Sequence, residues 1–160
     1  MLETRGAIDT ISLMLLDSNI VNDLTPAELK LAAGYFSVRN LEKRSVIFKE
    51  GDAGTFMCLV CAGTVGISKS KHIEQDDESL KLALLHKGRT FGEMAVLDGE
   101  RRSATCTAIT DCTLLVLSKE SIDKMIVEAP RVAAKLIRSM AVLLSRRLRM
   151  TTGKLAEHDL

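Results

Sequence analysis

The side chains best suited to chemistry in this sequence lie in one fifteen-residue segment, 91–105. Gly92 precedes a short stretch, 93–97, that has the composition of one or two helical turns. The first turn of a helix exposes unpaired backbone N–H groups at the positive end of the helix dipole, and both features attract an anion. The glycine has no side chain and lets this backbone come close to a ligand. The segment therefore predicts an anion-binding site.

Two charged side chains of the same segment complement this backbone cradle. Arg102 is expected at the opening of the next strand, where its planar guanidinium could hold two oxygens of a phosphate. Glu93 offers a carboxylate that could accept a hydrogen bond from a sugar hydroxyl beside that phosphate. A phosphate cradle with a neighbouring ribose acceptor indicates a nucleotide-binding site. The sequence contains neither a G-x-x-x-x-G-K-[ST] phosphate loop nor a G-x-S-x-G elbow.

The letters FGEMAV at 91–96 and RSA at 102–104 closely resemble the phosphate-binding cassette of cyclic nucleotide-binding domains. That cassette reads F-G-E-hydrophobic-A-hydrophobic, then a variable stretch, then R-[S/T/A]-A. Glycines at 51, 54 and 63 are similar to the family's early β-roll pattern, and the resemblance covers about residues 25–152. Cys58 and Cys106 depart from the usual large apolar and aliphatic residues, and both departures are expected in the core.

The resemblance also implies particular ligand contacts. Arg102 and the N–H groups of Met94, Ala95 and Ser103 would hold the cyclic phosphate, and Glu93 would accept the ribose 2′-hydroxyl. Other residues of the implied site are the cassette positions Gly92 and Ala104 and, beside the sugar and base, Ile67, Ala83 and Leu85. A hydroxyl directly after the arginine accompanies cGMP recognition in some members and contacts the phosphate in many bacterial cAMP binders. We favour cAMP over cGMP.

An alternative interpretation makes Arg102 and Glu93 a buried ion pair in a domain that no longer binds nucleotide. Burial removes the hydration of both charged groups. The free energy of this desolvation can exceed the attraction between the two charges unless further contacts are made. A ligand phosphate would help to offset that loss. We therefore favour a functional pocket over a degenerate one.

The elements that must position this site are helical at both ends of the chain and strand-rich in the middle. Residues 7–17 have helical spacing, and Thr25-Pro26-Ala27-Glu28 predicts a second helix with a capping box. The expected fold is α+β, mainly β: an antiparallel, jelly-roll-like β-roll flanked by N-terminal helices and two C-terminal helices. We divide this single domain into an N-terminal helical segment (1–37), the roll (38–118) and a hinge with a lid or dimerisation helix (119–152).

Short β-branched runs between glycine-containing turns predict the strands of the roll. An almost entirely polar stretch, 69–79, predicts an exposed hairpin loop, and Ser118 is expected to cap a helix that ends near residue 128. Pro130 opens a final helix that is expected to stop at Gly153. The predicted strands are 45–48, 55–61, 64–68, 80–85, 103–109 and 113–117.

Charge is balanced over the whole chain but not along it. The 160 residues contain 22 Lys and Arg against 21 Asp and Glu, which argues against a general nucleic-acid binder. Residues 131–154, however, carry seven basic and no acidic side chains. By the resemblance the final helix lies over the base, with Arg147 as the first capping candidate and Thr151 as the second. The register is open, because one alignment requires a four-residue insertion at 141–144.

The remaining features narrow the class of protein. No apolar run is long enough to span a membrane, no secretory signal opens the chain, and no His, Cys and carboxylate cluster has zinc spacing. Cys58 and Cys61 form a C-x-x-C within a predicted strand, where residues three apart point to opposite faces, so we expect them in the core. A cytoplasmic protein with reduced thiols and no bound metal is expected.

We therefore expect a cyclic nucleotide-binding sensor module, not an enzyme, without an effector domain of its own. It would form a homodimer through the final helix and act on an unidentified downstream protein. One alternative is a dimerisation or partner-binding scaffold with a degenerate pocket. Another is a nucleic-acid contact by the basic helix, although too few residues follow that helix to form a DNA-reading module.

Overall fold

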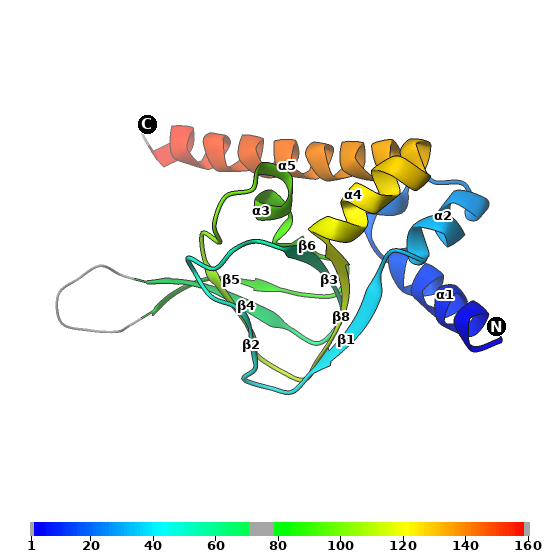
Figure 1. Cartoon of the computed structure of the whole chain (residues 1–160). Coiled ribbons are helices and arrows are strands. Elements are labelled where there is room, and N and C mark those ends of the chain that lie inside the picture. The colour runs from blue at the N-terminus through cyan, green and yellow to red at the C-terminus, as the bar shows by residue number, and fades with distance from the viewer. Residues whose placement is uncertain (1, 71–78, 159–160) are drawn as a thin grey trace.

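The computed structural model describes residues 2–70 and 79–158 and shows a β-roll with its helices gathered along one side (Figure 1). Two four-stranded antiparallel sheets form the roll, in the orders β1-β8-β3-β6 and β2-β7-β4-β5. The expected fold class, a mainly β α+β roll flanked by helices, is confirmed. The predicted hairpin loop falls mostly on 71–78, outside the described residues.

The helices and strands follow the predicted order, but the strands at 37–41 and 90–91 were not predicted. The strand expected at 103–109 begins only at Thr105, so Arg102 lies in the loop before it and not at its opening. The helical elements are α1 (Leu2–Leu15), the 3₁₀ turn η1 (Asn19–Val21), α2 (Pro26–Ala33), α3 (Glu93–Asp98), α4 (Lys119–Glu128) and α5 (Pro130–His158). The strands are β1 (Ser37–Leu41), β2 (Val46–Phe48), β3 (Phe56–Ala62), β4 (Val65–Ser70), β5 (Ser79–Leu85), β6 (Thr90–Phe91), β7 (Thr105–Ala108) and β8 (Cys112–Ser118).

Alternation along β3 separates two hydrophobic clusters. Met57 and Leu59 face the helices, while Cys58 and Val60 face the interior of the roll between the two sheets. Cys61 packs against the helical cluster, so the two cysteines of the C-x-x-C lie on opposite faces, as predicted. Burial raises the pKa of the Cys58 thiol to about 12, so this thiol stays protonated at neutral pH.

The predicted capping box begins α2. Thr25 Oγ1 accepts from the Glu28 N–H at 3.2 Å, and the Glu28 carboxylate accepts from the Thr25 N–H at 3.1 Å. The same carboxylate accepts from Lys135 Nζ at 2.6 Å, which connects α2 to α5. These hydrogen bonds, that from Lys135 foremost, lower the pKa of Glu28 to about 2.

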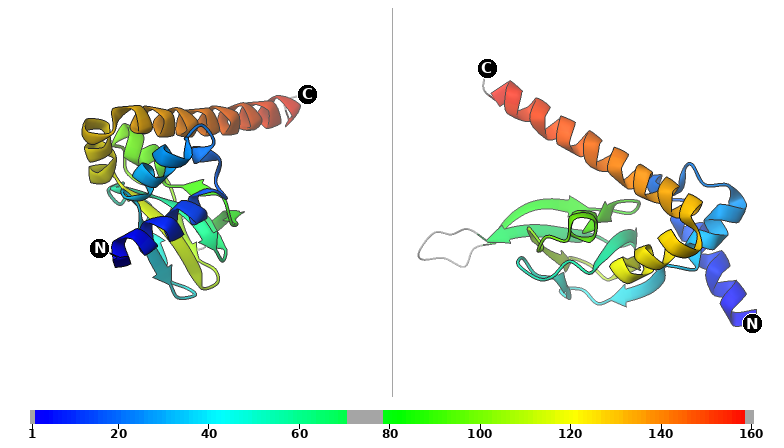
Figure 2. Two further views of the ribbon diagram at one scale, coloured as in Figure 1. Left: turned by 90° about the vertical axis from the view of Figure 1, so that its right-hand side faces the viewer. Right: turned by 45° about the horizontal axis from the view of Figure 1, so that its top comes forward.

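The final helix is longer than predicted. It continues through Gly153 to His158, so the expected stop at Gly153 was wrong. A glycine inside a helix lowers helix stability by only about 1 kcal/mol relative to alanine. The favourable helix propensity of the residues in the neighbouring turns offsets this loss. Figure 2 shows the C-terminal part of α5 extending past the roll. In the described part of the chain, no helix combines the length and apolar character that a membrane span needs.

Candidate functional site

A cavity of about 270 Å³ opens where the sequence predicts the anion site. Its walls come from β2, β4, β5, β6, α3, β7 with the loop before it and, from the far end of the chain, α5. The structure brings ten of the twelve predicted site residues to this cavity: Ile67, Leu85, Gly92, Glu93, Met94, Ala95, Arg102, Ser103, Ala104 and Arg147.

Two glycines permit the close approach of the segments that build the cradle. Gly92 caps α3 with φ +77°, and a Cβ there would lie 2.7 Å from Arg102 Nη1. Gly54 lies so close to α3 that a Cβ on it would overlap with Ala95 Cβ. The loop before β3 and the start of α3 are therefore in direct contact only because residue 54 has no side chain.

We expect Gly54→Ala to destabilise the protein by about 1–3 kcal/mol, because α3 must shift to admit the extra methyl group. Urea unfolding measures the change in free energy. Gly153→Ala is the matched control, since nothing lies within 4 Å of a Cβ at that position in α5. This control is expected to leave stability equal or slightly higher. A Gly54→Ala protein as stable as the wild type would contradict the close packing.

Arg102 lies at the floor of the cavity, 4% exposed. Its Nη1 donates to the Gly92 carbonyl at 2.8 Å, and its Nη2 donates to the Phe56 carbonyl. Its Nε has no hydrogen-bond partner. The guanidinium is thus anchored by backbone oxygens from two elements, and burial lowers its pKa below the usual value for arginine.

Glu93 pairs with a different arginine from the one considered in the sequence. Its Oε1 accepts from Arg147 Nη1, while Oε2 is buried and has no partner. Arg147 also donates to the carbonyl and the hydroxyl of Thr90, at 3.2 and 3.3 Å. The alternative of a buried Arg102–Glu93 ion pair is therefore wrong. The ion pair instead connects the first residue of α3 to α5.

Two predicted residues lie outside the cavity. Ala83 pairs with Ile67 across β4 and β5 and is exposed. Thr151 lies one turn beyond Arg147, where its hydroxyl donates to the Arg147 carbonyl at 3.0 Å. Only Arg147, of the two capping candidates, reaches the pocket in this structure.

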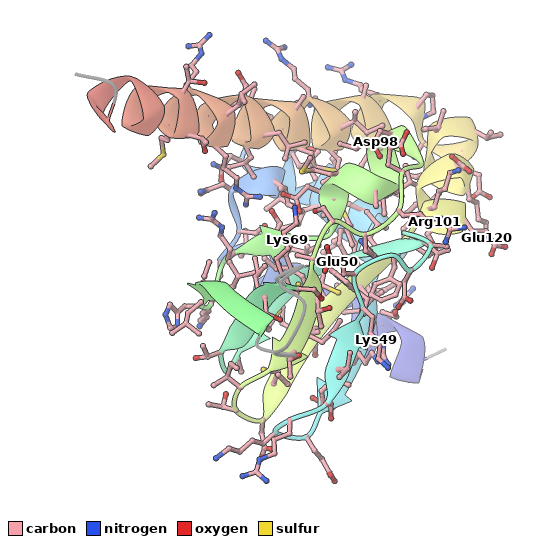
Figure 3. All side chains as sticks on the ribbon, turned by 90° about the vertical axis from the view of Figure 1, so that its left-hand side faces the viewer. Lys49, Glu50, Lys69, Asp98, Arg101 and Glu120 are labelled. Carbon is pink, nitrogen blue, oxygen red and sulfur yellow. The ribbon has the colours of Figure 1, made fainter. Side chains whose placement is uncertain are left out.

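Sequence reasoning missed several lining residues, among them Phe48, Arg89, Thr90 and Asp98. Thr90 and Arg89 directly precede the cassette, so their proximity could have been inferred from chain continuity. Phe48 comes from β2, and no local pattern indicates its position. Figure 3 labels Asp98 at the end of α3 and Arg101 in the loop that follows it. Among the residues whose placement is described, no three His, Cys, Asp or Glu side chains gather closely enough to hold a metal ion.

Comparison with known proteins agrees with this geometry. The family model "Cyclic nucleotide-binding domain" matches residues 38–129. The cyclic AMP receptor protein of Thermus thermophilus is 38% identical over 132 residues, which is 82% of this chain and 58% of that protein. The chain therefore spans less than two thirds of this relative.

Solved structures show the same fold. The catabolite activator protein of Thermus thermophilus aligns with a TM-score of 0.76 and 34% identity over 87% of this chain and 62% of that one. A cyclic nucleotide-binding domain from Methylobacillus flagellatus aligns with a TM-score of 0.80 over 96% of this chain and 84% of that one. Its identity is 22%, so this second likeness concerns the fold alone.

Proposed function

Because the chain belongs to the cyclic nucleotide-binding domain family, we propose that it is a regulatory, non-catalytic module that binds cAMP in preference to cGMP. The observation that carries this proposal is that two residues lining one cavity each have a buried polar side-chain atom without a hydrogen-bond partner. Arg102 Nε is a free donor and Glu93 Oε2 is a free acceptor. A cyclic phosphate supplies the acceptor for the first, and a ribose hydroxyl supplies the donor for the second.

Charge supports the same ligand. Four arginines and three carboxylates line the cavity, so its formal charge is +1. A cyclic nucleotide carries one negative charge, which this lining complements. The exposed hydroxyl of Ser103 borders the cavity beside Arg102 and is available to the phosphate. The proposed preference for cAMP rests on the similarity to the cyclic AMP receptor protein of Thermus thermophilus.

Isothermal titration of the purified protein with cAMP and with cGMP tests the proposal. We expect saturable binding of both at one site per chain, with the lower dissociation constant for cAMP. Tighter binding of cGMP would overturn the preference but not the site. Absence of saturable binding with either nucleotide would support the alternative of a scaffold with a degenerate pocket.

We also propose that a second copy of the chain pairs with it through α5. Apolar or small side chains recur along α5 with the alternating spacing of four and three residues that is typical of a coiled-coil seam. The seam carries Leu148, which is 69% exposed. Its residues are Ile137, Ala141, Leu144 and Leu148.

We expect Leu148→Glu to convert a dimer into a monomer, because the carboxylate would be desolvated within the apolar seam. Sedimentation equilibrium measures the mass. Val142→Glu is the matched control, since Val142 is 41% exposed on another face of the same helix and should leave the dimer intact. A monomeric wild-type protein would refute the proposed dimer. A Leu148→Glu dimer of unchanged affinity would refute the assignment of its interface to this seam.

A downstream protein is proposed to respond to α5. Arg147 is in contact with Glu93, so a ligand that binds beside Glu93 alters the surroundings of the helix directly. If α5 has two positions, the ligand shifts the equilibrium between them only by the difference in its affinity for the two.

A further inference from the structure

Aromatic rings surround the Arg102 guanidinium. The chain has four phenylalanines, and Phe48, Phe56 and Phe91 form one cluster around the floor of the cavity. Arg102 Cζ lies 3.8 Å from the ring centroid of Phe48 and 4.9 Å from that of Phe56. The centroids of Phe48 and Phe56 are 6.0 Å apart in an edge-to-face arrangement, and Phe91 lies 6.0 Å from Phe48.

This environment solves an electrostatic problem for a buried phosphate-binding arginine. In the described part of the chain, no carboxylate lies within ion-pair distance of the Arg102 guanidinium. A carboxylate would stabilise the cation but would also neutralise it and compete with an incoming phosphate. The negative face of an aromatic ring stabilises a cation without cancelling its charge. The positive charge of Arg102 therefore stays available to a ligand.

The hydrogen bonds fix the orientation of the guanidinium and leave Nε as its one nitrogen without a hydrogen-bond partner. The two terminal nitrogens are directed to the Gly92 and Phe56 carbonyls, and Nε has no partner. Phe56 contributes twice, because its carbonyl accepts from Arg102 while its ring faces the guanidinium. The guanidinium is thus fixed by hydrogen bonds to two carbonyls and by the two rings over which its central carbon lies.

We propose that Phe48 and Phe56 are positioning residues for phosphate recognition: they hold Arg102 as a charged, desolvated and oriented donor beside the cavity. This inference rests on the proposed function, since it assigns the phosphate of a cyclic nucleotide to that donor. Phe48 lines the cavity, whereas Phe56 is not among its lining residues. The effect of the two rings on affinity passes through the arginine.

Phe48→Leu tests the proposal because it keeps an apolar side chain and removes the aromatic face. We expect the dissociation constant for cAMP to rise about tenfold. Phe48→Tyr, which restores the face, is expected to recover most of that loss. Phe36→Leu, a buried phenylalanine of the helical cluster, is the control for a general loss of core packing and should bind cAMP as the wild type does.

A second measurement separates positioning from simple stability. The ¹⁵N relaxation of Arg102 Nε in the ligand-free protein reports the mobility of the guanidinium. We expect a rigid Nε–H vector in the wild type and in Phe36→Leu, and a mobile one in Phe48→Leu. Unchanged mobility of Nε and unchanged affinity for cAMP in Phe48→Leu would overturn the proposal that the ring positions Arg102. A wild type that binds no nucleotide would instead refute the proposed function, while the relaxation data would still decide whether the rings hold the arginine.

Discussion

Arg102→Ala is expected to raise the dissociation constant for cAMP by about thirtyfold to several thousandfold, which corresponds to the loss of a buried, charge-assisted contact. The guanidinium is 4% exposed and supplies the unpartnered Nε at the cavity floor. An alanine would leave the phosphate without this donor and would also release the Gly92 and Phe56 carbonyls from their hydrogen bonds. Calorimetry on the purified variant measures the change.

Two further variants make this result interpretable. Arg102→Lys keeps the positive charge but lacks the planar group that spans both carbonyls, so we expect it to recover little of the affinity. Arg39→Ala removes a positive charge of the same size from exposed β1 and controls for net charge; we expect it to bind as the wild type does. Thermal unfolding of all three confirms that each variant is folded. Binding by Arg102→Ala as tight as that of the wild type would refute the assignment of the phosphate site.

Arg147→Ala is expected to destabilise the ligand-free protein by about 2–3 kcal/mol. The substitution removes the partner of Oε1 from Glu93, which is 4% exposed and whose Oε2 already has none, so neither carboxylate oxygen is hydrogen-bonded. This expected loss of stability is smaller than that for a fully buried ion pair, because the Arg147 side chain is 28% exposed. Urea unfolding monitored by circular dichroism measures the free energy.

A double-mutant cycle identifies the cause of this loss. Glu93→Gln removes the charge, so the double variant Glu93→Gln/Arg147→Ala should be more stable than Arg147→Ala alone. Arg146→Ala is the control, because this neighbouring arginine is exposed, and we expect a change within about 0.5 kcal/mol. Equal stability of Arg147→Ala and Arg146→Ala would show that the contact with Glu93 contributes nothing.

Local chemistry made much of this fold predictable. The capping box of α2 depends only on the four consecutive residues 25–28, and the structure confirms this prediction. The opposite faces of Cys58 and Cys61 follow from the two-residue period of a strand. The cassette residues are close in sequence, so their convergence on one cavity follows from a single strand–helix–strand turn.

Contacts between distant segments were not predictable in the same way. The partner of Glu93 lies 54 residues away, and its identity depends on the path and rotation of α5 over α3. The enclosure of Arg102 depends on β2 and β3 meeting at the cavity floor, which no spacing in the sequence encodes. Thr151 was assigned from the motif alone, and one helical turn separates it from the pocket.

Two of the polar attachments of α5 have a mechanical consequence. Lys135 holds the helix to Glu28, and Arg147, twelve residues later, holds it to Glu93. The span between them is about 18 Å at 1.5 Å per residue, so a tilt of about 10° about the Lys135 attachment displaces Arg147 by about 3 Å. A hydrogen bond does not survive such a displacement. The helix therefore acts as a lever, in which a small angular change at one attachment decides whether the other is made or broken.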